Sequence, residues 1–379
     1  MEVKSGCKQT DLEDWQPKKF GEVAVPRRER IDPRRTGVHD FCIELEHIES
    51  GSGQILGSTS TGTQSSLKSV FHPGDVLFGK LRAYLRKYWR ATRQGVCSTE
   101  IWVLVPRGDT ATSEFLFQIV QTDDFIDATS NSYGTHMPRS DWNAVQNHEL
   151  KMPPLPEQHA IATALSDVDG LLRGLDRLIA KKRDLKQAAM QQLLTGQTRL
   201  PGFHGEWEVK RLGDVVQIKK GQLITSSTLM PGDIPVIAGG KQPAYYHASA
   251  NRLGRTVTIS ASGASAGYVA LYDEPIFASD CSTISESESY CLDFVFYQLL
   301  CKQQTIYKAQ TGGAQPHIHA KDLNPIPFSF PSLPEQTAIA EVLTELDGEL
   351  AVLEQRREKT RVLKQAMLQE LLTGRTRLV

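Results

Sequence analysis

Residues 80–93 carry the side chains best suited to binding chemistry. This stretch holds six cations and three aromatic residues, and no acidic residue lies among them. Lysine and arginine neutralise phosphate groups, while aromatic rings stack on bases or sugars. The composition therefore predicts a contact with nucleic acid. The alternative is a solvated basic face, because long cationic side chains also cover apolar surface.

A weaker basic set stands in the second half of the chain. It flanks a glycine-rich hairpin and comprises Lys219, Lys220, Lys241, Arg252 and Arg255. Glycine would let the hairpin backbone come close to a nucleic-acid surface.

Three patterns resemble enzyme sites, and each lacks a required part. Residues 74–80 fit a phosphate-binding loop until the next residue, where leucine replaces the Ser or Thr that should hold magnesium. Ser265 has the spacing of a nucleophile elbow, but a second strand follows it where a helix is needed. His317 and His319 have no third ligand nearby, which favours a polar surface loop over a metal site.

The bulk composition is that of a globular protein. The chain has 379 residues, of which 40% are hydrophobic and 23% charged, enough for two or three packed domains. A formal net charge of −1 gives no overall attraction to nucleic acid, so binding must rest on local charge. Six scattered cysteines and a polar N-terminal stretch predict a cytoplasmic protein with reduced thiols, no metal and no membrane segment.

One long element occurs twice. Residues 155–200 align with 333–378 at an offset of 178, without a gap, and 26 of the 46 positions are identical. Each copy begins Leu-Pro-Glu-Gln and ends Leu-Leu-Thr-Gly-x-Thr-Arg-Leu, whereas the segments before the copies share only short matches. Such a duplication suggests two related recognition modules on one frame.

Each copy is predicted to be a helix of about 60 Å at 1.5 Å per residue. Pro156 and Pro334 suit the first helical turn, and Gly196 and Gly374 are typical helix stops. Apolar residues recur at alternating steps of four and three, as in a coiled-coil seam. The two helices are expected to bury these stripes against each other. The alternative is that each helix packs on its own domain.

The other segments are predicted to be related α+β domains with bent, mostly antiparallel sheets. Trp15 and Trp207 begin the same pattern, Trp-x4-(Phe/Leu)-Gly-(Glu/Asp)-Val. The strand candidates are residues 75–79, 101–105, 256–260 and 268–271, and the helical patches are 112–121 and 291–303. The predicted order is a domain at 1–152, a helix at 153–200, a domain at 201–331 and a helix at 332–379.

Together these features resemble the specificity subunit of type I restriction-modification systems. The paired helices look like that family's spacers. The tryptophan pattern looks like the start of its target recognition domains, and residues 74–87 look like a strand-turn-strand segment within them. The likeness spans nearly the whole chain apart from a short lead, residues 1–14.

The resemblance implies a DNA-recognition protein without catalysis or a cofactor of its own. Each recognition domain would read one half of a split, asymmetric target in double-stranded DNA, and the antiparallel helix pair would fix the spacer between the halves. Two modification subunits, methyltransferases that use S-adenosylmethionine, would dock on the helices, and restriction subunits would join them. No membrane is expected among the partners.

Recognition loops differ between members, so DNA-binding residues are chosen from their chemistry. The candidates are Lys80, Arg82, Tyr84, Arg86, Lys87, His136, Arg139, Lys220, Lys241, Ser262, Ser265, His317 and Lys321. The candidates for docking the modification subunits are the helix starts: Pro156, Glu157, Gln158, Pro334, Glu335 and Gln336. Helix capping would explain these starts equally well. Other functions stay open: a coiled-coil scaffold with peptide-binding domains, a serine hydrolase using Ser265, or a nucleotide-dependent protein using Lys80.

Overall fold

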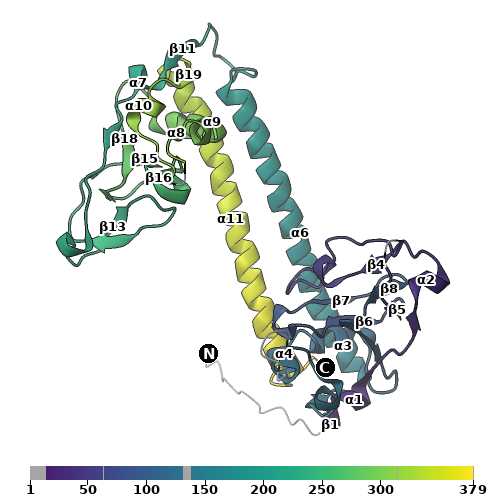
Figure 1. Ribbon diagram of the computed structural model, residues 1–379. Helices are drawn as coiled ribbons and strands as arrows, with labels where there is room; N and C mark the ends of the chain where they lie inside the picture. Colours follow the sequence, from purple (N-terminus) through teal and green to yellow (C-terminus); the bar gives the residue numbers. More distant parts are fainter. Residues whose placement is uncertain (1–13, 63, 131–137, 314, 379) are drawn as a thin grey trace, which may run out of the picture. The chain divides into compact units, whose positions relative to one another are not determined.

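The computed structural model describes residues 14–62, 64–130, 138–313 and 315–378, and the chain divides into two compact units (Figure 1). Unit 1 consists of residues 1–175 and 356–379, and unit 2 of residues 176–355. Each unit therefore combines one of the divergent segments with the start of one long helix and the end of the other.

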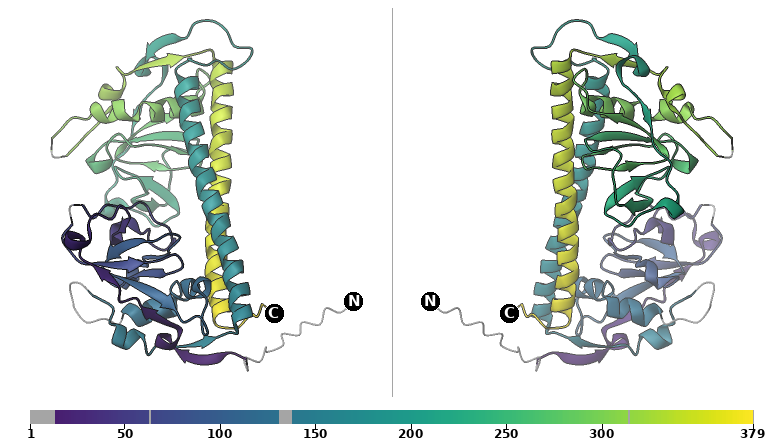
Figure 2. Two further views of the ribbon diagram at one scale, coloured as in Figure 1. Left: turned by 90° about the vertical axis from the view of Figure 1, so that its right-hand side faces the viewer. Right: turned by 90° about the vertical axis from the view of Figure 1, so that its left-hand side faces the viewer.

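The repeated element forms helices α6 (Leu155–Leu194) and α11 (Leu333–Leu372), each of 40 residues. The helices run side by side in Figures 1 and 2. In unit 1, Asp169 of α6 forms an ion pair with Lys364 of α11 at 2.7 Å. In unit 2, Lys186 of α6 pairs with Asp347 of α11. The residue numbers rise along one helix as they fall along the other, so the pair is antiparallel, as predicted.

The ends of both helices also belong to the cores of the units. In unit 1, Leu165 and Leu368 are buried in one cluster with Phe78. In unit 2, Leu343 is buried in one cluster with Phe294. Helix pairing and packing on a domain, which the sequence presented as alternatives, therefore both occur along the same apolar stripe.

The described residues of unit 1 form three sheets. One joins β2 (Ala24–Pro26), β9 (Ile101–Pro106), β6 (Val76–Gly79) and β7 (Tyr88–Arg90) in that order. A second joins β3 (Arg30–Ile31), β5 (Lys68–Phe71), β8 (Gly95–Ser98) and β4 (Cys42–Ile43), and a third pairs β1 (Gln16–Lys19) with β10 (Glu149–Met152). All these pairings are antiparallel except that of β4 with β8.

Unit 2 repeats this plan. One sheet joins β12 (Lys219–Lys220), β18 (Cys281–Ser285), β15 (Thr256–Ser260) and β16 (Val269–Tyr272). Another joins β14 (Tyr245–His247), β13 (Ile234–Ile237) and β17 (Phe277–Ala278), and the last pairs β11 (Glu208–Arg211) with β19 (Pro327–Phe330). Strand β15 is rich in β-branched residues and fully buried, as expected for a strand paired on both edges.

Short helices complete each unit. Unit 1 has α1 (Phe20–Val23), α2 (Pro33–Thr36), α3 (Ser113–Ile119), α4 (Asp123–Ser130), α5 (Trp142–Val145) and the 3-10 helix η1 (Leu45–His47). Unit 2 has α7 (Leu212–Val215), α8 (Leu292–Cys301), α9 (Gln303–Lys308), α10 (Ala320–Leu323) and the 3-10 helix η3 (Ser226–Thr228). The strand and helix candidates taken from the sequence are thus confirmed to within a few residues. Across the described part of the chain, no helix combines the length and apolar character needed to cross a membrane.

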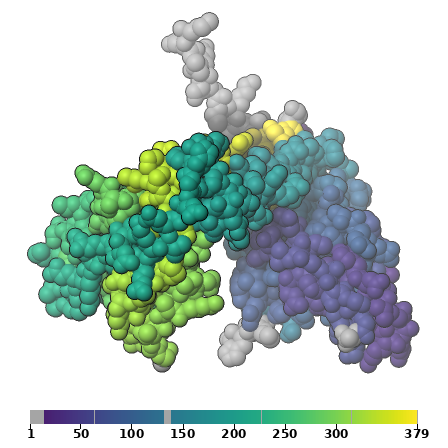
Figure 3. Space-filling view, turned by 90° about the horizontal axis from the view of Figure 1, so that it is seen from above, coloured from purple at the N-terminus to yellow at the C-terminus, as the bar shows by residue number. Residues whose placement is uncertain are grey.

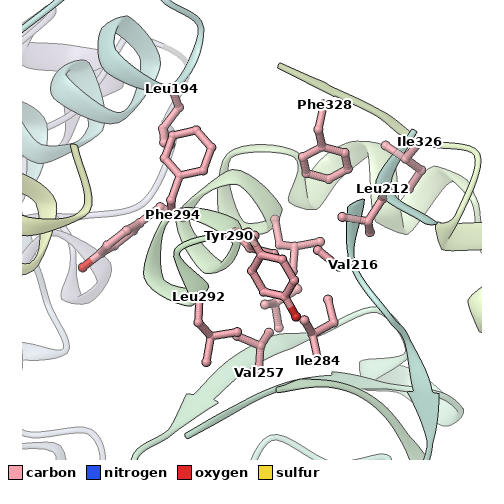
Figure 4. Close-up of a cluster of buried hydrophobic side chains, with 14 of the residues drawn as sticks. Leu194, Leu212, Val216, Val257, Ile284, Tyr290, Leu292, Phe294, Ile326 and Phe328 are labelled. Atoms are coloured by element: carbon pink, nitrogen blue, oxygen red, sulfur yellow. The ribbon is translucent and has the colours of Figure 1, made fainter. Parts of the chain in front are cut away.

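The core of unit 2 lies between its main sheet and the helices. Figure 4 shows Val257 and Ile284 of the sheet facing Tyr290 and Leu292, with Phe294 beside the end of α6. Burying one such side chain contributes about 1.5–3 kcal/mol. The cluster therefore ties the divergent segment firmly to the helix pair within this unit.

Candidate nucleic-acid interface

Each unit carries a hairpin with a compact connection. In unit 1, residues 80–87 join β6 to β7 and contain the 3-10 helix η2 (Ala83–Leu85); this connection is called tip 1. In unit 2, residues 261–268 join β15 to β16 and contain η4 (Gly263–Ser265); this connection is called tip 2. Most of the predicted DNA-binding residues lie on or beside these two tips.

Tip 1 is braced by the segment before α5. Leu81 forms a β-bridge with Arg139. The backbone N of Arg82 donates to the carbonyl of Pro138 at 2.9 Å, and the N of Leu85 donates to the carbonyl of Arg82 at 2.9 Å. The tip is therefore a defined turn, held at two places.

Tip 2 is braced in the same way by the segment before α10. Ser262 forms a β-bridge with His317. The backbone N of Gly263 donates to the carbonyl of Pro316 at 3.0 Å, and the N of Ala266 donates to the carbonyl of Gly263 at 3.0 Å. These equivalent bonds align the tips residue by residue, and they show that the duplication includes the predicted binding surface.

Three of the residues predicted to bind DNA lie on tip 1 and have side chains without polar partners in the described residues. Arg82 is exposed, Tyr84 is 56% exposed and Lys80 is partly buried. Within the described residues, none of these side chains makes a hydrogen bond or ion pair. Two cationic groups and one phenol are thus available to phosphates and bases, which is the chemistry predicted for this stretch.

Two other predicted residues of tip 1 are engaged inside unit 1. Arg86 binds the carboxylate of Asp123. The Nζ of Lys87 donates to the carbonyls of Leu45 at 2.6 Å and Ile48 at 3.0 Å. Both cations hold the tip to its surroundings. As DNA contacts they stay predictions, and the structure supplies a structural role for each.

The rest of the basic stretch is also engaged. Arg90 binds Glu114, and the guanidinium of Arg93 lies 4.3 Å from the centroid of the Phe41 ring. Four of the six cations between residues 80 and 93 therefore make contacts within unit 1. The composition of this stretch alone suggested more positive charge available to DNA than the structure leaves. At the rim, Arg139 donates to Glu100 at 2.9 Å. His136, the other predicted rim residue, lies outside the described residues.

Of the predicted residues, Ser262 and Ser265 lie on tip 2, and Lys241 lies beside it. Lys241 is exposed, with its Nζ 5.5 Å from the centroid of the Tyr268 ring. Ser262 donates to the carboxylate of Asp280, and Ser265 lies partly buried in η4. This surface offers one cation, hydroxyl groups and an acceptor, which suits base-edge contacts more than phosphate neutralisation.

His317 completes tip 2 through its backbone. Its N and O pair with Thr311 at 2.8 Å each, and its ring stacks on that of His319 at 6.2 Å. In the described part of the chain, no group of three metal-binding side chains is present. Lys321 is exposed on α10, and Lys220 is exposed on β12, where it pairs with Ser282.

One basic surface was missed by the sequence reasoning. A cavity of about 620 Å³ in unit 1 is lined by Arg27, Arg28, Arg30, Arg107 and Trp142, among others. Its signal was present in the chain, since residues 27–35 contain five arginines. Arg27 is held by a bidentate contact with Asp75 at 2.9 and 2.8 Å.

The start of α6, which carries the repeated Leu-Pro-Glu-Gln motif, is buried in contacts within unit 1. Glu157 accepts two hydrogen bonds from Arg377, at 2.6 and 2.8 Å, and one from the Trp15 indole at 3.1 Å. Gln158 donates to the carbonyl of Thr110 at 2.8 Å. The helix start therefore binds both the domain before it and the end of α11.

Unit 2 repeats this junction at the start of α11. Glu335 accepts two hydrogen bonds from Arg199, at 2.5 and 2.7 Å, and Arg199 lies 5.6 Å from the centroid of the Trp207 ring. Gln336 accepts from the backbone N of Cys291 at 3.1 Å. In the space-filling view, the teal end of α6 and the loop after it lie against the yellow-green start of α11 (Figure 3).

The docking of partners at the helix starts stays a prediction, and the structure supplies a structural role for four of the six residues. The four Glu and Gln side chains are at most 7% exposed and bind the chain itself; they are Glu157, Gln158, Glu335 and Gln336. Pro156 and Pro334 remain exposed. Through these side chains the motif joins helix ends to domains.

The enzyme-like patterns have structural explanations. Residues 76–79 of the phosphate-loop pattern form strand β6. Ser265 lies in a hairpin, because β15 pairs antiparallel with β16. This arrangement confirms the hairpin interpretation and lacks the strand-turn-helix of a nucleophile elbow.

A family model described as the type I restriction modification DNA specificity domain matches the chain twice, over residues 13–181 and 204–361. The chain belongs to this family. It contains two of these specificity domains. Each match contains one tip, so the divergent segments are the specificity domains that the doubled architecture predicted.

Similar proteins agree with this assignment. The EcoDI specificity subunit of Escherichia coli is 28% identical over 158 residues, which cover 40% of this chain and 35% of that protein. The chain thus spans about a third of that relative. The MjaVIII specificity subunit of Methanocaldococcus jannaschii is 24% identical over 320 residues, covering 75% of each chain.

Two solved structures share the fold. The S subunit of a type I restriction-modification system from Mycoplasma genitalium has a TM-score of 0.67 and 16% identity, covering 98% of both chains. A chain from a structure on complex assembly and conformational transition of a type I system has a TM-score of 0.62 and 24% identity, covering 95% of this chain and 98% of that one.

Proposed function

We propose that this chain directs a type I restriction-modification complex to a split, asymmetric target, with each unit reading one half. The observation that carries the proposal is the pair of equivalent tips with different side chains. Tip 1 presents Lys80, Arg82 and Tyr84, whereas tip 2 presents Ser262 and Ser265, with Lys241 beside it. The two tips have the same backbone conformation but carry different hydrogen-bonding side chains. This combination suits two recognition domains that approach DNA in the same way and select different bases.

The helix pair would set the unspecified spacer between the half-sites. In support, an ion pair in each unit joins the start of one long helix to the segment that follows the other, Glu157 with Arg377 and Glu335 with Arg199. A recognition domain held at two helix ends cannot slide along the pair without breaking these contacts. Two recognition domains held at a fixed separation would bind two half-sites with a fixed number of base pairs between them.

The partners would be two methyltransferase subunits that carry S-adenosylmethionine, with restriction subunits where the system has them. A surface for docking them is supported within unit 2. Leu178 and Leu185 lie seven residues apart on one face of α6 and are 42% and 50% exposed. Exposed leucines on one helix face favour a protein partner over solvent.

Methylation-sensitive sequencing of the host genome tests the proposal. We expect a split, asymmetric motif with a modified adenine in each half, and we expect deletion of this gene to erase it. A methylation pattern unchanged by the deletion would contradict the proposal. Retarded migration of random duplex DNA at low salt separates this function from a peptide-binding scaffold, which should cause no shift.

The docking surface has its own test. The double variant Leu178→Glu/Leu185→Glu should lose co-purification with the methyltransferase subunits, because it places two charges in an apolar contact. Lys181→Glu/Ala188→Glu is the matched control, at the same spacing and also exposed on α6. Equal retention of the partner by both variants would show that this face is not the docking surface.

A further inference from the structure

The two tips share a backbone but differ at its two left-handed positions. In tip 1, Arg82 and Arg86 have φ values of 54° and 51°. At the equivalent positions of tip 2, Gly263 and Gly267 have φ values of 77° and 80°. A left-handed backbone brings Cβ close to a carbonyl oxygen, and only glycine avoids this strain. Tip 1 therefore retains strain at two positions where the other copy has none.

The strain at Arg86 is offset within unit 1. Its guanidinium binds the carboxylate of Asp123 and donates to the carbonyl of Gln121 at 3.3 Å. These contacts join the tip to the start of α4. Glycine at this position would lose them, so an internal reason for the arginine exists.

The strain at Arg82 has no such compensation. Its side chain is exposed and makes no hydrogen bond or ion pair within the described residues. Its backbone N donates to Pro138, but Gly263 makes the same bond to Pro316 without any side chain. The fold of unit 1 therefore gains nothing from this guanidinium. Strain that the fold does not require is typical of functional positions.

We infer that Arg82 is a specificity-determining residue, which reads a base edge in the half-site of unit 1. The inference rests on the proposed function. A phosphate contact serves any sequence, so it would be expected at the same place in both tips. A base contact must differ between readers of different half-sites, and position 82 is arginine in one tip and glycine in the other. Guanine is the expected base, because arginine pairs bidentately with its O6 and N7.

Selection from a random duplex library tests this inference. The full chain, bound to its methyltransferase subunits, is used as wild type and as Arg82→Gly. We expect the variant to lose preference at one position of one half-site by about tenfold or more. The remaining positions should be unchanged. The slope of binding against salt should also be unchanged, because no phosphate contact is removed.

Two further variants distinguish loss of base recognition from loss of stability. Arg86→Gly removes the other strained arginine, and we expect it to lower the melting temperature, because it breaks the contacts with Asp123 and the carbonyl of Gln121. Arg82→Asn keeps a residue that tolerates left-handed backbone, and it should also lose the guanine preference at that position. Neither substitution at position 82 should lower the melting temperature.

Several results would overturn the inference. One is an unchanged motif for Arg82→Gly. Another is uniform weakening with a salt slope reduced by about 0.9, which identifies a phosphate contact. A third is a lower melting temperature, which identifies a structural role. If the wild-type complex itself selects no split motif, the proposed function fails, and this outcome is distinct from all three.

Discussion

The buried ion pair between the long helices in unit 1 allows a quantitative test of how the frame is held together. Lys364 of α11 contacts Asp169 of α6 and the side-chain carbonyl of Gln121, each at 2.7 Å. The three residues are only 8%, 9% and 2% exposed. One lysine thus joins both helices to the recognition domain.

The variant Lys364→Met should destabilise unit 1 through the acid it leaves behind. Removing one partner of a buried ion pair costs about 3–5 kcal/mol, because the other charge stays buried without compensation. We take the lower end, about 3 kcal/mol, since Asp169 lies at an edge that water can approach. For a unit of this size, that loss lowers the melting temperature by about 6–12 °C.

The double variant Asp169→Leu/Lys364→Met should recover most of this loss. It leaves no buried charge, and replacing a buried pair with apolar residues is often neutral. The carbonyl of Gln121 still loses its donor, which costs about 1 kcal/mol. The double variant should therefore be about 2 kcal/mol more stable than the single variant, by the difference of these two estimates.

Denaturant unfolding followed by tryptophan fluorescence suits the measurement, because four of the five tryptophans belong to unit 1. Arg183→Met is the control. Its ion pair with Glu354 is exposed, at 61% and 41%, so the expected change is below about 1 kcal/mol. A double variant no more stable than Lys364→Met would refute the reasoning, because the stranded charge would then not be the cause.

Three other outcomes are expected. Arg377→Ala and Arg199→Ala should each destabilise the protein by about 3 kcal/mol, measured by thermal melting, since each strands a buried glutamate; equal stability to wild type would contradict the role of these junctions. Removing one heptad from both helices should shorten the frame by about 10 Å and the methylated spacer by about three base pairs, with both half-site sequences kept. Burial raises the pKa of the Cys42 thiol to about 11 and that of Cys281 to about 12, so at pH 7 the reactive thiolate is almost absent. Among the cysteines that the structure describes, alkylation read by mass spectrometry should therefore label exposed Cys301 first, and fast labelling of Cys281 would argue against its burial.

The duplication gives these contacts an internal control. Asp169 and Lys364 lie at an offset of 178 from Asp347 and Lys186, which also form an ion pair. In unit 2 the pair is joined to the recognition domain by Tyr297, whose hydroxyl donates to Asp347 at 2.8 Å. The same device, a charge pair tied to the domain by a third side chain, therefore holds each unit to the helices.

The sequence alone determined the parts of this protein that depend on local pattern. The four-three spacing of apolar residues predicted both long helices, because residues at that spacing lie on one face only when the chain is helical. Runs of β-branched residues predicted β6, β9, β15 and β16 for a similarly local reason. The repeat and its end motifs were sufficient to indicate the family.

Only the tertiary structure decided which charged groups are free. Arg86 and Lys87 stand in the same basic run as Arg82, yet they bind Asp123 and two carbonyls of a distant loop. Glu157 looked available at a helix start but is paired with Arg377, 220 residues away. Such contacts join residues far apart in the chain, so they cannot be predicted from the local composition. The left-handed backbone at Arg82 is likewise imposed by its bond to Pro138 and by the hairpin around it, so residue type gave no sign of it.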